Sequence, residues 1–570
     1  MQMRTESMRI LVVGGVAAGA SAATKARRAN EDAEIVIFER GPYVSFANCG
    51  LPYYVSGEIQ RMEDLLLMTP ERFAERFRID VRLYHEVTGI DREAHTIEVR
   101  DLRSGRTSLE RYDRLILAPG ARPILPPLPG ITLPGVFTLT TVPDAERLRE
   151  VIASRQVRRA VVVGAGFIGL EVAEAFLKQG IETHLVEKLP QLMPQMDAEM
   201  AAPLAAHLVD RGAHLHLGAE VAAFRGGVEL EGVELASGEL LPAEVAVVSI
   251  GVRPELGLAV DAGLEIGAAG GVVVDERMRT SDPDIYACGD VVEVVSLVTG
   301  RRVRLPLAGP ANKEGRVAGA NAAGGDMTFP GVVGTSIVRV CDLTAAKTGL
   351  SEREARLAGF DPLVSYTNPM DHAGYYPGGR RLAIKLVADR QTGRVLGAQI
   401  VGAQGVDKRI DVLATAIYGG MSVEDLEGLD LAYAPPYSSA KDPVIMAGFV
   451  AANEWRGEVD VVTPLELAER LDGGEPLRVL DVRTPEEYED GHIPGAESAP
   501  LERLRDSLHR IEKSLPITVY CLVGYRSYHA CKILAHHGYQ VRNLSGGFMT
   551  WSQAFPDRVV RGREPVGIGR

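Results

Sequence analysis

Two stretches of this chain repeat one pattern, and that repeat restricts the possible folds more than any other feature. Residues 8–40 read MRILVVGGVAAGASAATKARRANEDAEIVIFER, and residues 158–188 read RRAVVVGAGFIGLEVAEAFLKQGIETHLVEK. Each contains an apolar strand, a glycine-rich turn, a helix with small residues on one face, and a second strand that ends in an acid. The sequence therefore predicts two β-α-β units.

The second copy has the full spacing of a dinucleotide-binding turn. Gly164, Gly166 and Gly169 form G-x-G-x-x-G, and Glu187 ends the next strand. Such glycines permit a tight turn and let a pyrophosphate approach the helix N-terminus, while the acid accepts hydrogen bonds from a ribose. Because Glu187 would repel a 2′-phosphate, we expect NADH rather than NADPH, although the neighbouring Lys188 weakens that preference.

The first copy departs from this spacing, because Val16 replaces the middle glycine. It retains Gly14, Gly15 and Gly19, and Glu39 and Arg40 follow its second strand. Taken alone, this copy is also compatible with a β-α-β crossover that binds no ligand. Two later segments, ILAPGARP (116–123) and TSDPDIYACGDV (280–291), resemble the further flavin-site segments of two-dinucleotide-binding flavoproteins. The resemblance implies bound FAD together with NAD(H), with Asp290 bonded to the ribitol chain and Glu39 and Arg40 near the cofactor.

Charge and cysteine content exclude several other classes of protein. The formal net charge is −14 and no run of five basic residues occurs, which argues against nucleic-acid or anionic-membrane partners. No apolar segment approaches the ~20 residues of a spanning helix. The five cysteines are odd in number and widely spaced, so we expect no metal cluster and no disulfide framework, but individual thiols in a reducing cytoplasm.

The N-terminal apolar run ILVVGGVAAGASAA imitates a secretory signal, but it continues into a helical TKARRAN that a removed peptide would not need. The sequence leaves open which of Met1, Met3 and Met8 is the start residue.

Residues 334–453 are strands followed by helices without a nucleotide signature, and a new strand-helix alternation begins near residue 455. We therefore place a domain boundary there.

One short motif identifies the family that the chain resembles. SFANCGLP has Ser45, Phe46, Cys49 and Pro52 in the register of S-F-x-x-C-x-x-P. Residues 8–450 resemble the coenzyme A-disulfide reductase and persulfide reductase branch of the pyridine nucleotide-disulfide oxidoreductases, and residues 460–560 resemble a rhodanese domain. The resemblance implies an α/β two-dinucleotide-binding flavoprotein with two Rossmann-like domains, an α+β dimerisation domain and a C-terminal α/β rhodanese domain. The expected bounds are 8–145 with 246–325 for FAD, 146–245 for NAD, 326–452 for dimerisation and 460–565 for rhodanese.

Cys49 has no second cysteine at the spacing that disulfide reductases of this superfamily use. It must therefore form a mixed disulfide with a substrate from outside, and we expect a lowered thiol pKa that favours the reactive thiolate. Ser45 and Asn48 are the expected substrate contacts beside it. A single cysteine also serves NADH peroxidases and oxidases, which carry a histidine in the first glycine-rich loop; here Ala17 stands at that place. We therefore rank peroxide reduction below sulfur chemistry.

The resemblance also implies substrate contacts elsewhere in the chain. DHAGYYPGG (371–379) and LAYAPPYSSAKDP (431–443) are similar to segments that each bring a tyrosine across a dimer interface, by register Tyr375 and Tyr433. We expect a homodimer in which these phenols assist a departing thiolate, with aromatic interface packing as the alternative. Arg27 and Arg28 are candidates for contacts with coenzyme A phosphates, with solvated surface positions as the alternative.

The second candidate thiol is Cys521, in YCLVGYRS between an apolar strand and a helix. The loop predicts N–H groups around the sulfur, and Arg526 adds positive charge. Cysteine phosphatases use a loop one residue longer, so this loop fits sulfur better than phosphate. Asp481 and Arg483 match the rhodanese pattern as supports. The remaining cysteines, Cys288, Cys341 and Cys531, are expected in the core.

These observations together predict sulfane-sulfur chemistry. Cys521 would carry sulfur as a persulfide, and Cys49 with FAD and NADH would reduce low-molecular-weight persulfides or polysulfides such as coenzyme A persulfide. The alternatives are coenzyme A-disulfide reduction, NADH peroxidase or oxidase activity, and a redox-sensing sulfur carrier. The sequence leaves open which acceptor is physiological and whether sulfur passes directly from Cys521 to Cys49.

Overall fold

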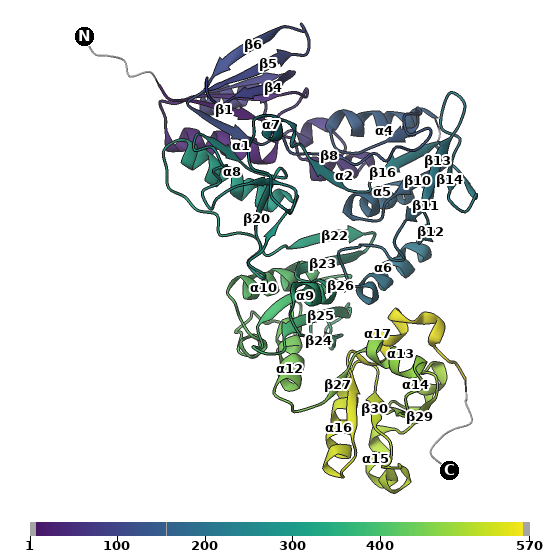
Figure 1. Ribbon diagram of the computed structural model, residues 1–570. Helices are drawn as coiled ribbons and strands as arrows, with labels where there is room; N and C mark the ends of the chain where they lie inside the picture. Colours follow the sequence, from purple (N-terminus) through teal and green to yellow (C-terminus); the bar gives the residue numbers. More distant parts are fainter. Residues whose placement is uncertain (1–6, 156, 563–570) are drawn as a thin grey trace. The chain divides into compact units, whose positions relative to one another are not determined.

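The computed structural model describes residues 7–155 and 157–562. The candidate start residues Met1 and Met3 and the last positions of the expected 460–565 domain lie outside the described residues. The chain divides into two compact units. The first comprises the chain up to Pro190 together with Gly212–Val332, and the second comprises Gln191–Arg211 and the chain from Val333 onward. Each unit is described by itself (Figure 1).

The first β-α-β unit forms the centre of a five-stranded parallel sheet, in the order β19-β7-β1-β2-β3. Its strands are β1 (Arg9–Val13), β2 (Glu34–Glu39), β3 (Ile79–Leu83), β7 (Arg114–Leu117) and β19 (Ile285–Ala287). Helix α1 (Ala17–Ala29) packs closely on α8 (Ala308–Ala322). A Cβ on Gly315 would lie 2.2 Å from the Ala18 carbonyl oxygen, so the small residues of both helices allow their backbones to touch.

The second β-α-β unit builds a second parallel sheet, in the order β12-β11-β10-β16-β9. Its apolar strands are buried on both faces, as expected for a parallel sheet. The two Rossmann-like sheets of the expected fold are therefore confirmed. The elements are β9 (Val136–Phe137), β10 (Arg159–Val163), β11 (Glu182–Glu187), β12 (His214–Leu217), β16 (Val245–Val248), α4 (Val142–Arg155) and α5 (Phe167–Lys178).

Two features show how the strands and helices of the NAD-type region are shared. Strand β16 pairs with β10 and β9, so the NAD-type sheet includes strands between residues 136 and 248. The crossing between the two halves is the antiparallel pair β8 (Ala121–Pro123) and β17 (Val252–Pro254). Helix α6 (Ala198–Asp210), expected in the NAD domain, belongs to the second unit instead. Strand pairing and helix packing fix these limits, and neither is local in sequence.

Smaller elements complete the first unit. Two three-stranded antiparallel sheets, β4-β5-β6 and β13-β14-β15, accompany the parallel sheets. The short strands β18, β20 and β21 form a third small sheet, and short helices connect the strands. These elements are β4 (His85–Asp91), β5 (Thr96–Asp101), β6 (Thr107–Arg111), β13 (Val221–Arg225), β14 (Gly232–Leu235), β15 (Leu240–Pro242), β18 (Val272–Val273), β20 (Val292–Val295), β21 (Arg302–Val303), α3 (Pro70–Phe77) and α7 (Gly257–Asp261).

The second unit begins with an antiparallel sheet in the order β22-β23-β26-β25-β24, which helices cover. It confirms the expected α+β domain. Its elements are β22 (Ser336–Val340), β23 (Leu343–Gly349), β24 (Pro362–Thr367), β25 (Leu382–Asp389), β26 (Val395–Gly402), α9 (Glu352–Ala358), α10 (Val406–Tyr418), α11 (Val423–Glu427) and α12 (Pro443–Trp455).

A third parallel sheet follows α12, in the order β27-β31-β30-β28-β29, with helices on both sides. The first strand, β27 (Val461–Val462), agrees with the expected start near residue 460. The other elements are β28 (Arg478–Asp481), β29 (Ala496–Ser498), β30 (Ile517–Tyr520), β31 (Val541–Leu544), α13 (Pro464–Asp472), α14 (Pro485–Asp490), α15 (Leu501–Ser507), α16 (Tyr525–His536) and α17 (Gly547–Ala554).

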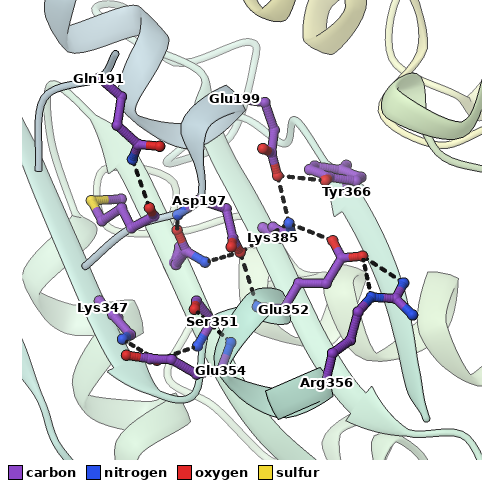
Figure 2. Close-up of polar contacts among 12 residues, drawn as sticks. Gln191, Asp197, Glu199, Lys347, Ser351, Glu352, Glu354, Arg356, Tyr366 and Lys385 are labelled. Carbon is purple, nitrogen blue, oxygen red and sulfur yellow. Dashed lines mark hydrogen bonds and ion pairs between the residues drawn. The ribbon is translucent and has the colours of Figure 1, made fainter. Parts of the chain in front are cut away.

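A buried ion cluster attaches α6 to the antiparallel sheet (Figure 2). The ammonium of Lys385 is 1% exposed and lies 2.9 Å from Asp197 and 2.8 Å from Glu352, with Glu199 as a third carboxylate partner. Burial alone would raise the pKa of Asp197 and Glu352, but Lys385 outweighs it and lowers both. Tyr366 donates a 2.7 Å hydrogen bond to Glu199. The cluster therefore joins α6 and the residue before it to the antiparallel sheet of the second unit.

Among the described helices, none combines the length and the apolar character needed to cross a bilayer.

Candidate active site

The first glycine-rich turn is held by the acid that ends β2. Gly14 has a φ of +88°, in the region that favours glycine, and its N–H donates to the Phe38 carbonyl. Glu39 accepts hydrogen bonds from the N–H groups of Gly15 at 2.9 Å and Gly41 at 2.8 Å. The turn and the acid therefore form one rigid unit at the C-terminal edge of the sheet, where a dinucleotide binds in such folds.

The second turn repeats this geometry. Glu187 accepts from the N–H groups of Ala165 at 2.8 Å and Leu189 at 2.9 Å. In both copies the third glycine packs against the first glycine of the turn. A Cβ on Gly19 or on Gly169 would lie 1.9 Å from the carbonyl oxygen of that first glycine. The two predicted motifs therefore have the same backbone structure.

The middle position tests whether a dinucleotide fits. A Cβ on Gly166 would meet no atom within 4 Å, so packing within the protein does not require glycine there. A glycine in open space at a helix N-terminus fits the close approach of a pyrophosphate. At the equivalent place in the first copy, Val16 shows that the turn itself tolerates a side chain.

Asp290 follows β19 and is half-buried, and burial raises the pKa of its carboxyl group. Next to it, Glu314 on α8 accepts a 2.8 Å hydrogen bond from the Gly289 N–H, and burial raises the pKa of Glu314 to about 7. Sequence reasoning missed Glu314; the signal was an acid among small residues of a helix. Arg40 is exposed beside Glu39, and Cys288 is fully buried, as expected.

The segment that carries Cys49 is tied to the first glycine-rich turn. The Ser45 N–H donates 2.8 Å to the Gly15 carbonyl, and its φ is +49°, a conformation unusual for a non-glycine residue. The chain then forms a short 3₁₀ turn, η1 (Asn48–Gly50), and helix α2 (Leu51–Val55). The thiol of exposed Cys49 lies 3.7 Å from the Asn48 side-chain oxygen. Asn48 is thus placed beside the sulfur by local structure, while Ser45 ties the segment to the turn.

Helix α2 also contacts the NAD-type domain. The Tyr53 hydroxyl donates 3.1 Å to Glu171 on α5, the Gln179 amide donates 2.9 Å to the Val55 carbonyl, and Arg149 lies over the Tyr54 ring. Cys49 consequently lies where the two dinucleotide-binding halves of the first unit meet. Such a position suits a thiol that exchanges electrons with groups bound to both halves.

The electrostatics of Cys49 differ from the expectation. Burial of the sulfur by neighbouring atoms raises the pKa of the thiol, and the carboxylates of Glu171 and Asp290 raise it further. The chain's own charges therefore do not supply the expected lowering. A lowered pKa would require a positive dipole or an electron-poor ring near the sulfur. Among the described residues, only the backbone N–H of Cys49 lowers the pKa of the thiol.

Of the two arginines on α1, one has a structural role. Arg27 is 5% exposed and donates to the carbonyl oxygens of Phe77 at 2.7 Å, Arg78 at 2.9 Å and Glu31 at 2.7 Å. These bonds attach α1 to the chain before β3. Arg28 is exposed and is the member of the pair that faces solvent.

The two candidate tyrosines meet in the second unit. The hydroxyls of Tyr375 and Tyr433 lie 2.9 Å apart, and both side chains are exposed. The hydrogen bond that the Tyr375 hydroxyl makes with Tyr433 raises the pKa of Tyr375. Two segments that the sequence separates therefore present one paired phenol group at the surface.

Cys521 lies at the end of β30, 1% exposed, with its sulfur 3.2 Å from the Gly524 N–H and 3.5 Å from the Ser527 hydroxyl. Gly524, at φ +94°, turns the loop into α16. An N–H and a hydroxyl that point at sulfur stabilise a thiolate or a persulfide anion.

Arg526 is close to Cys521 but is also held by an acid that sequence reasoning missed. Its guanidinium donates to both oxygens of Glu487, at 2.7 and 2.6 Å. This bidentate pair lowers the pKa of Glu487 to about 2. The available signal was the T-x-x-E capping box of α14, in which Glu487 also accepts the Thr484 N–H.

Behind the loop, Arg483 forms a buried pair with Asp481, with contacts at 2.6 and 3.0 Å, and donates 2.6 Å to the Gly491 carbonyl. Both residues support the sheet edge below Cys521, as expected.

Cys531 is buried on α16, also as expected. Cys341 is not a core residue: it is half-buried at the β22–β23 hairpin with a φ of +57°, because the tight turn fixes its backbone.

Comparisons with known proteins match the whole arrangement. The family model of the pyridine nucleotide-disulphide oxidoreductases matches residues 8–315, the dimerisation-domain model of the same family matches residues 335–443, and a rhodanese-like domain model matches residues 463–554. The NAD(P)H sulfur oxidoreductase (CoA-dependent) of Pyrococcus furiosus is 37% identical over 441 residues, covering 77% of this chain and 98% of that protein.

Two solved structures extend the similarity through the C-terminal domain. The reduced CoADR-RHD of Bacillus anthracis is 43% identical with a TM-score of 0.95, covering 98% of this chain and 100% of that one. The NAD-dependent persulfide reductase from A. fulgidus is 40% identical with a TM-score of 0.90, covering 95% of this chain and 100% of that one. Both coverages are too large to leave out the C-terminal domain.

Proposed function

This chain belongs to the pyridine nucleotide-disulphide oxidoreductase family, whose members use FAD and NAD(H), and on that premise we propose that it reduces coenzyme A persulfide through Cys49 while Cys521 handles sulfane sulfur. The observation that carries this proposal is the combination of two thiols in one chain. Cys49 forms no disulfide with any described residue, and Cys521 lies in a loop that points an N–H and a hydroxyl at its sulfur.

The residues that would hold the cofactors are those of the two turns. Gly14, Gly15, Gly19, Glu39, Arg40 and Asp290 would contact FAD, and Gly164, Gly166, Gly169 and Glu187 would contact the nicotinamide dinucleotide. We propose NADH over NADPH, because the fixed carboxylate of Glu187 would repel a 2′-phosphate. When bound, FAD and NADH supply the two electrons that open a disulfide at Cys49.

The chain's own sulfur performs the covalent step. The Cys49 thiolate attacks the inner sulfur of coenzyme A persulfide, the S–S bond breaks, and hydrosulfide leaves, which gives a Cys49–S–S–CoA mixed disulfide. Two electrons and a proton then return Cys49 thiolate and release coenzyme A thiol. The net reaction is persulfide plus NADH plus H⁺ to thiol, hydrogen sulfide and NAD⁺. A persulfide already contains the S–S bond that a lone cysteine needs.

Neighbouring side chains orient and protonate the reactants. Asn48 accepts from the Cys49 thiol, and Ser45 ties its segment to the first turn. Tyr375 and Tyr433, contributed across a homodimer interface, would donate to the departing coenzyme A thiolate. Exposed Arg28 is the proposed contact for the coenzyme A phosphates.

Cys521 would supply the persulfide. Its thiolate takes the outer sulfur from a sulfane donor, which forms the persulfide anion Cys521–S–S⁻ and releases the donor without that sulfur. A coenzyme A thiolate then takes that sulfur and regenerates Cys521. Gly524, Ser527 and Arg526 would stabilise the anionic persulfide between these steps.

A second candidate is reduction of coenzyme A disulfide, because attack of Cys49 on either sulfur yields the same Cys49–S–S–CoA intermediate.

Anaerobic NADH oxidation by wild type, Cys49→Ser and Cys521→Ser distinguishes the candidates when coenzyme A persulfide, polysulfide, coenzyme A disulfide and peroxide are compared. We expect persulfide turnover to fall at least 100-fold in Cys49→Ser. Full persulfide activity in that variant would overturn the proposal, and steady turnover with peroxide alone would favour the peroxidase alternative. Reduction that stops after one equivalent of NADH would favour a sensor.

A further inference from the structure

One short segment of the C-terminal domain contacts the Cys521 loop on one side and the antiparallel sheet on the other. We call Ser545–Thr550 the docking segment. Toward the loop, the Phe548 N–H donates 2.8 Å to the Cys521 carbonyl, and the Met549 N–H donates 2.9 Å to the Leu522 carbonyl. A Cβ on Gly547 would lie 2.4 Å from the Cys521 carbonyl oxygen. The loop therefore rests directly on this segment.

On its other side, the docking segment bonds to β24 and the residue that follows it. The Tyr366 N–H donates 2.8 Å to the Ser545 hydroxyl oxygen. The side-chain amide of Asn368 donates 3.0 Å to the Gly546 carbonyl and 3.0 Å to the Thr550 hydroxyl oxygen. Asn368 is 4% exposed, so both acceptors are satisfied by the protein rather than by water.

Asn368 itself has a fixed place. Its carbonyl accepts a 2.7 Å bond from Arg381, and Met370 pairs with Arg381, so the two ends of the loop that carries Tyr375 are closed beside it. The neighbouring Tyr366 hydroxyl bonds Glu199 in the buried Lys385 cluster. The amide of Asn368 thus extends from a rigid part of the sheet.

We propose that Asn368 is a positioning residue for Cys521: the dimerisation domain forms part of the sulfur site, and the rhodanese domain works as a fixed module rather than as one tethered by its linker. This inference rests on the proposed function of Cys521. Without the Asn368 amide, the Gly546 carbonyl and the Thr550 hydroxyl oxygen each lose a buried donor, and the docking segment below the Cys521 loop loses two of its bonds to the dimerisation domain.

The test compares three variants of the full-length holoenzyme. Asn368→Ala removes both donors, Thr550→Val removes one acceptor, and Thr550→Ser keeps that acceptor. Asn321→Ala is the matched control, because Asn321 is also a buried asparagine and donates to the main-chain carbonyls of Arg277 at 2.9 Å and Met327 at 2.8 Å in the first unit. Should Asn368→Ala fail to fold, the two Thr550 variants test the proposal by themselves.

Two readouts separate positioning from general stability. One is kcat/KM for sulfur transfer from thiosulfate to cyanide, and the other is the pH dependence of Cys521 alkylation by iodoacetamide, followed by peptide mass spectrometry. We expect about a tenfold loss of sulfur transfer and an altered pH dependence in Asn368→Ala, a smaller change in Thr550→Val, and none in Thr550→Ser or Asn321→Ala. Wild-type transfer rates and an unchanged pH dependence in Asn368→Ala and Thr550→Val would overturn the proposal.

The alkylation readout does not depend on the assigned reaction. If wild type transfers no sulfur from thiosulfate, that part of the proposed function fails, but an altered alkylation profile in Asn368→Ala and Thr550→Val alone would still support positioning. An alkylation profile identical in all variants would reject it.

Discussion

The guanidinium of Arg526 is bound by both carboxylate oxygens of Glu487, so the cation of the Cys521 loop is held by an acid from a different helix. A bidentate pair of this kind fixes direction as well as charge. Glu487 therefore sets how much of the positive field of Arg526 reaches the sulfur. The motif C-x-x-x-x-R contains the cation but not this second partner.

Replacing Glu487 with glutamine should destabilise the C-terminal domain and strengthen binding of anionic sulfur donors. We expect the free energy of unfolding to fall by about 1 kcal/mol at pH 7 and the KM for thiosulfate to fall severalfold. The pKa of Glu487 is lowered to about 2, so its stabilisation is complete above the ordinary carboxyl pKa and is lost as pH falls through about 2. Urea unfolding at several pH values checks this; Glu502→Gln, an exposed acid elsewhere in the domain, is the control. A deficit independent of pH would contradict the assignment.

Glu171→Gln should lower the pKa of the Cys49 thiol. Burial is the largest cause of the raised pKa and persists in the variant. The substitution removes the Glu171 carboxylate, whose negative charge raises the thiol pKa more than that of Asp290 does. The pH at which iodoacetamide alkylates Cys49 at half its maximal rate should shift downward. Exposed Glu93→Gln in the same unit should leave the curve unchanged. A curve for Glu171→Gln that matches wild type would show that this carboxylate does not reach the sulfur.

Glu187→Ala should weaken the binding of NADH and reduce the preference for NADH over NADPH. The variant removes the acceptor of the Ala165 and Leu189 N–H groups and the charge that opposes a 2′-phosphate. We expect the KM for NADH to rise about tenfold while kcat/KM for NADPH is retained or increases, as measured by steady-state kinetics with both nucleotides. Equal losses for NADH and NADPH would indicate a purely structural role for the acid.

Lys385→Met should be strongly destabilising, because three carboxylates lose their buried cation. We expect a loss of about 3–5 kcal/mol in the free energy of unfolding. The lowered pKa values of Asp197 and Glu352 contribute stability above the ordinary carboxyl pKa that is lost as pH falls below it. The deficit of the variant should therefore shrink toward acid pH. Lys347→Met, which breaks a single pair with Glu354, should cost less; equal losses would contradict the cluster's role.

Tyr375→Phe and Tyr433→Phe should each reduce turnover of coenzyme A persulfide, because the two hydroxyls act as one hydrogen-bonded group. We expect losses of about 10- to 100-fold in kcat/KM, and a double variant no worse than about the poorer single one. Tyr418→Phe, another exposed tyrosine of the same unit, serves as the control. Independent, multiplicative effects would show that the paired hydroxyls are not a functional unit.

Local sequence determined much of this protein. The turns at Gly14 and Gly164 lie with their acids Glu39 and Glu187 inside single β-α-β units, and the Cys521 loop is one short segment, so their spacing predicted their structure. The α/β class followed from the same repeats, while the dimerisation and rhodanese domains followed from the resemblance, and both are confirmed. The resemblance singled out Tyr375 and Tyr433, but only the tertiary structure shows that their hydroxyls pair.

The tertiary structure decided the rest, because the deciding contacts join residues far apart in the chain. Arg27 is buried by carbonyl groups around residue 78, Lys385 binds α6 to the antiparallel sheet, and β16 pairs with the distant strand β10. The raised pKa of Cys49 depends on burial and then on the charges of Glu171 and Asp290, and the support of Cys521 depends on Asn368. Burial and charge are summed over neighbours in space, and a single sequence does not reveal those neighbours.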